Sequence, residues 1–385
     1  MKITILGPAH PYRGGLASIM EMLARTFQRR GHEVDIRTFT LQYPALLFPG
    51  KSQTVATPPP ADLRIFRCVN TMTPLNWLQV GRALRRERPD FILLTYWTPF
   101  MAPCFGPIPR VAPGPAHTNV LCHTAPRAPP EPHPRRRPHH LYFLRSVDGF
   151  IYMSEQVHRE LQAYTSAPAL FSPHPLFENF GTRCPREEAC ARLGLDPSLR
   201  YALFFGLIRD YKGLDLLLDA WAQLKLQGRT AGRRLIVAGE FYTSKERYLR
   251  QIAAAGLGEE VLLHDRFIPD AEVKYYFSAA DFVVQPYKSA TQSGVTQIAY
   301  QFCMPMLVTD VGGLAEIVPP DRVGYVCAPD AGAIAEYIDR LFDPETLGRF
   351  SRNCIEERRR FSWEAMCDRL TDRYGQFARE PGLHA

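Results

Sequence analysis

The chain has 385 residues, of which 46% are hydrophobic and 22% are charged, and its formal net charge is +7. These values predict a globular protein of two or three domains with a large core, and the lack of any run of about 18 apolar residues excludes a membrane-spanning helix. Nine cysteines without a CxxC pair or other metal spacing predict free thiols in a reducing cytoplasm, and MKITILGPAHP reads as a strand and a turn rather than a signal peptide.

The positive charge is concentrated in the first half of the chain. Residues 1–180 contain 20 Lys and Arg against 11 Asp and Glu, whereas residues 181–385 contain 26 against 28. A basic first half is compatible with contact to anionic lipid headgroups, with a phosphorylated acceptor, or with a solvated surface that has no partner. Nucleic acid ranks below these because no DNA- or RNA-binding motif is visible.

Strand and helix patterns alternate along the whole chain. In the first half, apolar runs predict strands at 2–8, 32–40, 91–97, 119–124 and 149–154, and helical spacing predicts helices at 17–31 and 76–90. The alternation restarts after residue 180, with strands at 201–208, 234–240, 260–266, 282–287, 305–310 and 323–329 and helices at 213–228, 270–280 and 295–303. The Pro-rich stretch at 123–140 is predicted to be a loop.

This β-α-β wiring predicts an α/β fold of two facing Rossmann-like domains, each with a parallel sheet covered by helices on both faces. Proline and glycine break the pattern at 171–188, which places the boundary between a first domain of residues 1–178 and a second of residues 179–360. Because ligands bind beyond the carboxyl ends of the strands in such folds, the loops that directly follow strands are the candidates for a site.

Two of these loops carry groups suited to phosphate. Gly14 and Gly15 follow the first strand and open a helix, where backbone amides can approach a pyrophosphate, although a tight turn with positive φ explains the same pair. Arg209 and Lys212 lie between strand 201–208 and the next helix, where a guanidinium fork and an ammonium can clamp a diphosphate. The alternative for this second pair is an ordinary charged surface loop.

A third loop carries a histidine. His123 stands at the carboxyl end of strand 119–124, where it can donate a proton to a substrate hydroxyl or a leaving group. A lone histidine is more often structural, but of the eleven in the chain this one has the placement best suited to chemistry.

The stretch SATQSGVTQ opens helix 295–303 with small and polar residues. Its possible hydrogen-bond donors are the side chains of Thr291, Gln292 and Ser293 and the unpaired backbone amides of Ser293, Gly294 and Val295. Capping the helix needs only one hydroxyl, so the run predicts a ligand with several oxygens.

Several motifs together resemble the family 4 glycosyltransferases, which have the two-domain GT-B fold. The matching stretches are PYRGG, FFGLIRDYKGLDLLLDA, LIVAGE, DRFIPDAEVKYYFSAADFVVQPY and FCMPMLVTDVGGLAEIV. The stretch RRRFSWEAMCDRLTDRYGQF resembles the closing segment of the family, which implies that residues 361–385 form a helix crossing back to the first domain. The resemblance covers nearly the whole chain, and the second-half motifs are the more specific.

The resemblance implies transfer of a sugar from a nucleotide-sugar donor to an acceptor, with retained anomeric configuration and with no metal or other cofactor. It implies an acceptor-side first domain and a donor-binding second domain. Arg209 and Lys212 match the phosphate-binding pair of the family. Gly15 matches the glycine whose amide reaches the donor phosphates or the acceptor, and His123 matches the histidine near the transferred sugar.

Two further positions follow from the resemblance. Ile268, in DRFIP, matches the position whose backbone reads the nucleobase, and Glu240, in VAGE, is a candidate to support the groups that touch the donor.

One departure from the family is clear. The family carries two glutamates separated by seven residues around helix 295–303, and the corresponding residues here are Ala290 and Ile298. Because no glutamate lies anywhere in 273–315, either the protein is inactive or the TQSG stretch supplies neutral donors in place of the pair. A bacterial branch of the family is similar in having TQSG here, together with CHN and HE in the first domain, where this chain has CHT and EPH.

The sequence therefore predicts a metal-independent glycosyltransferase that moves a hexosyl group from a UDP- or GDP-linked donor to a saccharide or lipid-linked saccharide, in cell-surface polysaccharide or glycolipid synthesis. It is expected in the cytoplasm, with peripheral contact to the inner face of the membrane. The first alternative is an inactive sugar-nucleotide-binding or scaffold protein, and the second is a nucleotide-sugar epimerase or phosphorylase. A dinucleotide oxidoreductase is disfavoured because neither half has the Gly-rich fingerprint.

Overall fold

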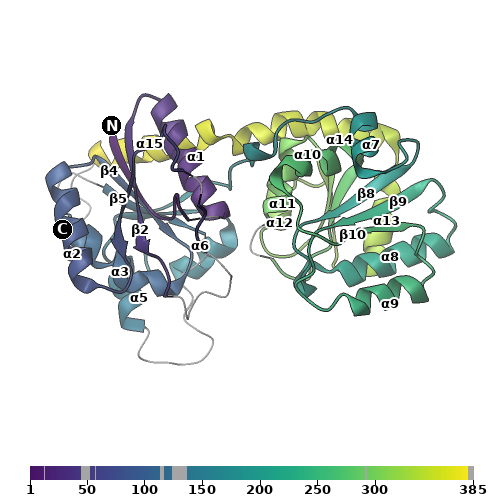
Figure 1. Cartoon of the computed structure of the whole chain (residues 1–385), viewed down its shortest axis with the longest axis horizontal. Coiled ribbons are helices and arrows are strands. Elements are labelled where there is room, and N and C mark those ends of the chain that lie inside the picture. The colour runs from purple at the N-terminus through teal and green to yellow at the C-terminus, as the bar shows by residue number, and fades with distance from the viewer. Residues whose placement is uncertain are drawn as a thin grey trace. The chain divides into compact units, whose positions relative to one another are not determined.

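The computed structural model describes residues 1–12, 14–44, 53–56, 58–112, 117–123, 137–290 and 293–379. The chain divides into two compact units. Unit 1 comprises Met1–Pro173 together with the chain from Trp363 onward, and unit 2 comprises His174–Ser362 (Figure 1). Each unit has its own parallel sheet.

The unit-1 sheet has the strand order β3-β2-β1-β4-β5-β6-β7 within the described residues. Its strands are β1 (Lys2–Leu6), β2 (Glu33–Leu41), β3 (Ile65–Asn70), β4 (Phe91–Tyr96), β5 (His117–Cys122), β6 (Gly149–Tyr152) and β7 (Ala169–Phe171). Its helices are α1 (Gly15–Arg29), α2 (Pro74–Glu87), α3 (Ala102–Phe105), α4 (Pro107–Val111), α5 (Arg137–Leu144), α6 (Glu155–Gln162) and α15 (Trp363–Arg379), with a 3-10 turn η2 (Pro99–Met101). The two edge strands β3 and β7 are absent from the sequence prediction.

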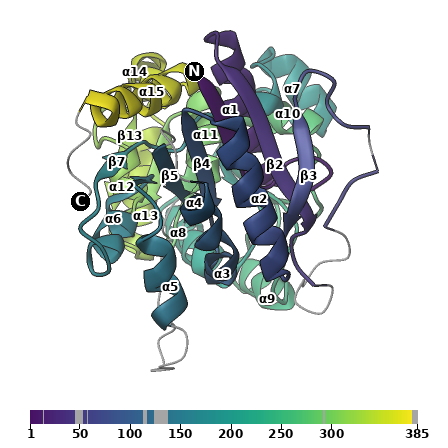
Figure 2. The ribbon, with the colours of Figure 1, turned by 90° about the vertical axis from the view of Figure 1, so that its left-hand side faces the viewer.

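Helices cover both faces of the unit-1 sheet. Side chains of β4 alternate between the faces: Phe91 and Leu93 pack with α1 and α15, whereas Ile92 and Leu94 pack with α2, α3 and α4. Figure 2 shows α2 and α4 in front of the strands. The closing helix α15 contacts α1 directly, so the last helix of the chain is part of the unit-1 core.

The unit-2 sheet has the strand order β10-β9-β8-β11-β12-β13 within the described residues. Its strands are β8 (Arg200–Phe205), β9 (Arg233–Ala238), β10 (Val261–His264), β11 (Phe282–Gln285), β12 (Met306–Thr309) and β13 (Gly324–Cys327). Its helices are α7 (Arg186–Leu193), α8 (Leu214–Leu226), α9 (Glu246–Ala254), α10 (Asp270–Ala279), α11 (Gly294–Gln301), α12 (Leu314–Ile317), α13 (Ala331–Leu341) and α14 (Pro344–Glu357), with 3-10 turns η3 (Glu178–Phe180), η4 (Asp210–Lys212) and η5 (Arg358–Phe361).

Alternation along β8 separates two cores in unit 2 as well. Tyr201 and Leu203 pack with α10 and α11, whereas Ala202 and Phe204 pack with α8 and α13. The prediction of an α/β fold with two Rossmann-like domains is therefore confirmed. In both sheets the strand order reverses beside the first strand of the unit, between β1 and β4 and between β8 and β11. Such a switch point is where doubly wound sheets bind their ligands.

Among the described residues, no helix is both long enough and apolar enough to cross a lipid bilayer.

Candidate functional site

The switch point of unit 2 is formed by the loops that follow β8 and β11. Gly213 ends η4 with φ 69°, and a Cβ atom there would lie only 1.9 Å from the carbonyl oxygen of Pro286. The Lys288 N–H donates to the carbonyl of Tyr211 at 2.7 Å. The two loops are thus fixed against each other, and this close approach requires glycine at position 213.

Lys212 is nearly buried in this corner, with 8% of its surface exposed. Its ammonium lies 5.6 Å from the ring centroid of Tyr287, and a Cβ atom on Gly206 would lie 3.1 Å from that ammonium. Burial and then the neighbouring charge of Arg209 lower the pKa of Lys212 to about 8. An anion bound beside this ammonium would stabilise its charge, so the corner is suited to an anionic ligand.

Arg209 lies on the exposed side of the same loop, with its guanidinium carbon 5.1 Å from the ring centroid of Tyr242. Within the described part of the chain, neither Arg209 nor Lys212 has a carboxylate oxygen within 4.0 Å. The sequence predicts both cations in one loop, and in the structure they share it with no neutralising carboxylate from the described residues. Two such cations are available to a ligand that carries two phosphates.

The start of α11 lies beside this corner. Ser293 caps the helix, since its Oγ accepts the Val295 N–H at 3.2 Å, and the same Oγ lies 3.2 Å from the hydroxyl of Tyr287. The Val295 side chain approaches Gly206, because a Cβ atom on that glycine would lie 3.6 Å from Val295 Cγ2. At Gly294 a Cβ atom would lie 3.1 Å from the ring of Phe177.

The prediction of unpaired amides at the start of this helix is therefore corrected for Val295. Its N–H has an intrachain partner because Ser293 is the N-cap, as the simpler capping interpretation of the stretch proposed. The helix also begins at Gly294 rather than at residue 295. Thr291 and Gln292 lie outside the described residues.

In unit 1, the predicted Gly14 and Gly15 open α1. Gly14 is the N-cap with φ 107°, which explains why glycine is needed there, and Gly15 is the first helical residue. Both are exposed, and among the described residues, chain neighbours aside, a Cβ atom on either would meet no atom within 4 Å. None of the described residues therefore fills the space beside these two glycines, and close approach of a ligand to the backbone requires such space.

His123 follows β5 directly. Its backbone N–H donates to the carbonyl of Tyr96 at 2.9 Å, which continues the β4–β5 pairing by one residue and fixes His123 at the carboxyl edge of the sheet. This placement agrees with the predicted strand end, and the residue is partly exposed.

Glu240 and Ile268 follow β9 and β10. Glu240 is exposed, and its carbonyl accepts the Ile208 N–H at 2.9 Å, which ties its loop to the loop that carries Arg209. The side chain of Ile268 is 7% exposed and belongs to the core, so only its backbone is available to a ligand, whereas the neighbouring Phe267 is 64% exposed.

An aromatic cluster at the carboxyl edge of the unit-1 sheet was not predicted. The indole N–H of Trp97, which follows β4, donates to the hydroxyl of Tyr43, which follows β2, at 2.7 Å. The Tyr43 and Phe100 rings lie 5.4 Å apart, and all three side chains are partly exposed. The signal in the sequence was aromatic residues at or just beyond the ends of the predicted strands 32–40 and 91–97.

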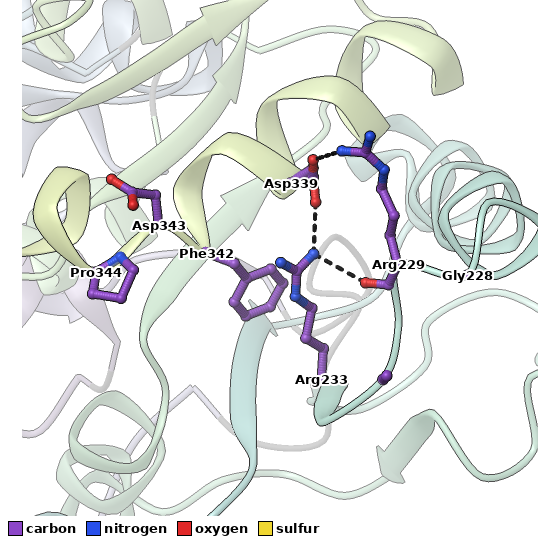
Figure 3. Close-up of a pocket in the computed structure, with 8 residues that line it drawn as sticks. Gly228, Arg229, Arg233, Asp339, Phe342, Asp343 and Pro344 are labelled. Carbon is purple, nitrogen blue, oxygen red and sulfur yellow. Dashed lines mark hydrogen bonds and ion pairs between the residues drawn. The ribbon is translucent and has the colours of Figure 1, made fainter.

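A separate hollow of about 550 Å³ lies at the amino end of β9 (Figure 3). Arg233 and Arg229 both reach Asp339 on α13, with a distance of 2.7 Å for Arg233. Burial opposes the charge of Asp339, but hydrogen bonds from the two arginines outweigh it and lower the pKa of this carboxyl. Arg229 and Arg233 therefore both pair with Asp339, and these ion pairs connect α13 to the amino end of β9. The two arginines have a structural role here and are not free to bind a ligand.

Among the described residues, no group of three or more His, Cys, Asp or Glu side chains is arranged to hold a metal ion.

Comparison with known families identifies the class of protein. Residues 13–170 match the family described as Glycosyltransferase Family 4, and residues 200–343 match the family described as Glycosyl transferases group 1. The first match lies in unit 1, and the second spans the β8-to-α13 region that contains the Lys212 corner. The chain belongs to the family 4 glycosyltransferases, as its sequence motifs predicted.

Curated relatives are similar mainly over part of their length. A D-inositol 3-phosphate glycosyltransferase of Segniliparus rotundus is 32% identical over 222 residues, which is 55% of this chain and 48% of the relative. One of the same name from Streptomyces bingchenggensis is 27% identical over 247 residues, 61% of this chain and 54% of the relative. The chain spans about half the length of the curated relatives it matches.

Solved structures match the fold over nearly the whole chain. A sucrose-phosphate synthase from Thermosynechococcus elongatus has a TM-score of 0.72 at 20% identity, over 98% of this chain and 99% of its own. The Anabaena protein HepE in complex with UDP has a TM-score of 0.72 at 15% identity, over 98% of this chain and 100% of its own. These structures support the GT-B assignment.

Proposed function

We propose that this protein is a retaining glycosyltransferase that transfers a sugar from a nucleotide diphosphate sugar to a saccharide or lipid-linked saccharide. The observation that supports it most is the buried Lys212, which lies beside Arg209 and the start of α11 and has no carboxylate partner among the described residues. Cleavage of the donor leaves negative charge on the diphosphate, and fixed cations at this position stabilise it. A metal ion is not required for this step.

Each predicted residue has a role in this proposal. The amides at Gly14 and Gly15 would approach the donor phosphates or the acceptor, and His123 would contact the transferred sugar. Neutral donors from the TQSG stretch, namely Thr291, Gln292, Ser293 and Gly294, would hold the sugar hydroxyls in place of the absent glutamates. Val295 is left out of this set because its N–H donates to Ser293. The backbone at Ile268 would meet the nucleobase, and Glu240 would support the loop of Arg209.

A UDP-sugar is the first donor to test, because HepE has been solved with UDP and with UDP-glucose. A polyhydroxylated acceptor that carries phosphate is the first acceptor to test, because the curated relatives are named for D-inositol 3-phosphate and the first half of this chain is basic. The same positive charge supports a cytoplasmic protein that contacts anionic membranes peripherally during cell-surface polysaccharide or glycolipid synthesis.

A thermal-shift screen against UDP-, GDP-, ADP- and CMP-sugars tests the donor, because a bound donor raises the melting temperature by mass action. The best donor is then incubated with candidate acceptors, with and without EDTA, and the anomeric configuration of the product is read by NMR. Transfer with retention that is unchanged by EDTA is expected. No shift with any nucleotide sugar, or a product with inverted configuration, would contradict the proposal.

The absence of glutamate in 273–315 favours one second candidate, a donor-binding protein without catalysis. This candidate predicts a thermal shift with a nucleotide sugar but neither hydrolysis of that donor nor transfer. Slow release of free sugar from the donor by the wild-type protein, lost in Lys212→Ala, would exclude it.

A further inference from the structure

Arg209 and Lys212, the two cations of the loop after β8, each lie over the ring of a tyrosine. The Arg209 guanidinium carbon lies 5.1 Å from the ring centroid of Tyr242, and the Lys212 ammonium lies 5.6 Å from that of Tyr287. A cation within about 6 Å of an aromatic centroid is attracted by the electron-rich face of the ring. Each cation is therefore paired with the face of a tyrosine.

Two carboxylates that could have served instead are occupied by other cations. Asp210, in the same loop as the two cations, pairs with Arg247 of α9. Asp215, in the first turn of α8, pairs with Lys288 at 2.5 Å. A carboxylate on Arg209 or Lys212 would use their N–H donors and repel a diphosphate, whereas a ring face leaves those donors for the ligand.

Tyr287 is itself held from two sides. Its carbonyl accepts the hydroxyl of Thr309 at 2.6 Å, and its own hydroxyl lies 3.2 Å from Oγ of Ser293, the N-cap of α11. The residue is 3% exposed. One rigid side chain thus connects the buried ammonium of Lys212 to the start of the helix.

We propose that Tyr287 and Tyr242 are positioning residues, which hold Lys212 and Arg209 by their ring faces and so keep both cations ready for the diphosphate of the donor. This inference rests on the proposed function. Tyr287 ends the stretch DRFIPDAEVKYYFSAADFVVQPY that resembles the family, whereas Tyr242 lies outside the matching stretches. Tyr287 additionally connects Lys212 to the first turn of α11 through the hydroxyl of Ser293, and so fixes the position of the ammonium relative to the helix start.

Matched variants separate the ring from the hydroxyl. Tyr287→Leu and Tyr242→Leu remove the ring face, whereas Tyr287→Phe and Tyr242→Phe keep it. Calorimetric titration with inorganic pyrophosphate and with UDP is expected to show affinity about 3- to 30-fold weaker for each leucine variant and within about 2-fold of wild type for each phenylalanine variant.

The pH dependence of pyrophosphate binding distinguishes positioning from mere packing. The groups that face the Lys212 ammonium are Arg209, on its own loop, and Tyr287, against which Tyr211 packs at 6.0 Å. Because Tyr287→Leu admits water to the ammonium, the pKa of Lys212 should rise and the loss of affinity with increasing pH should move to higher pH. Tyr287→Phe should leave that midpoint in place.

Wild-type pyrophosphate affinity and an unchanged pH midpoint in Tyr287→Leu would overturn the inference for Tyr287. If the buried Tyr287→Leu variant does not fold, the test rests on Tyr242→Leu and Tyr242→Phe, since Tyr242 is 55% exposed. Their affinities for pyrophosphate then decide whether a tyrosine ring face positions the cation. If the wild-type protein binds neither pyrophosphate nor UDP, the proposed function fails and this inference with it. If the wild type binds both and the leucine variants match it, only this inference fails.

Discussion

The two units share one strand order but differ in the chemistry at their switch points. In unit 2, the loops after β8 and β11 bring together the buried Lys212, Arg209 and the start of α11. In unit 1, the carboxyl edge of the sheet carries the exposed turn at Gly14 and the linked rings of Tyr43 and Trp97. The common wiring decides where a ligand binds, and the loops decide which ligand it is.

Burial of the Lys212 charge in unit 2 also lowers the stability of the fold. Because the pKa of Lys212 in the folded chain lies below its unfolded value, its burial destabilises the fold below about pH 8. This cost declines as the pH rises from about 8 toward the unfolded value, since the unfolded chain then binds the extra proton. A cost of this kind is typical of a binding site, where stability is exchanged for affinity.

Removal of the Lys212 ammonium should have the largest effect of the changes that distinguish the two units. Lys212→Ala is expected to lower sugar transfer by about 10²- to 10³-fold and to weaken donor binding, because one fixed charge at the diphosphate is lost. Steady-state kinetics and calorimetry measure both. His123→Ala in unit 1 serves as the contrast, since it should reduce transfer with little loss of UDP affinity. Unchanged turnover in Lys212→Ala would contradict the assignment of this site.

Glycine substitutions compare the rigidity of the two switch points. Gly213→Ala is expected to destabilise the protein by about 2–3 kcal/mol, because φ is 69° and a Cβ atom would lie 1.9 Å from the carbonyl of Pro286. Gly14→Ala should cost only about 1 kcal/mol, since φ is 107° but a Cβ atom there would meet none of the described residues within 4 Å, chain neighbours aside. Urea denaturation monitored by circular dichroism measures the difference, and equal losses would show that the loop contact in unit 2 is not tight.

Capping residues provide a smaller contrast between the units. Ser293→Ala should lower the free energy of unfolding by about 1 kcal/mol, because the Val295 N–H loses its acceptor and the Tyr287 hydroxyl loses its neighbour. Thr73→Ala should have almost no effect, since Thr73 is the N-cap of α2 without a side-chain cap bond. Melting temperatures of the two variants test this, and a larger loss for Thr73→Ala would be inconsistent with the described caps.

The fold and the cationic pair were accessible from the sequence because the apolar runs of the strands and the position of Arg209 and Lys212 after a strand are local patterns. Edge strands β3 and β7 were missed, since the polar Arg67 and Asn70 interrupt the apolar run of β3 and β7 is only three residues long. Tyr242 and Tyr287 were missed for a different reason. Their significance depends on cations brought near them by folding, which no spacing along the chain reveals.

The Val295 amide is a second case in which the sequence alone could not identify the hydrogen-bond partner. A polar stretch before a helix predicts both capping and ligand binding, and only the geometry of Ser293 shows that the cap is made. The predicted exchange of charged for neutral donors rests on Gln292 and Thr291 and stays a prediction. Gln292→Ala tests it, and retention of both transfer and donor affinity would leave the stretch with its capping role alone.

Proton uptake on nucleotide binding is the most direct test of whether the diphosphate of the donor binds at Lys212. UDP is titrated into the protein near pH 8.5 in buffers of different ionisation enthalpy, for wild type and for Lys212→Arg. Since the pKa of Lys212 is about 8 in the free protein and a diphosphate raises it, the wild type should take up a substantial fraction of one proton per UDP. Lys212→Arg, which stays charged, should take up almost none. Binding of UDP with no proton uptake, or with equal uptake in both proteins, would contradict placement of the diphosphate at Lys212.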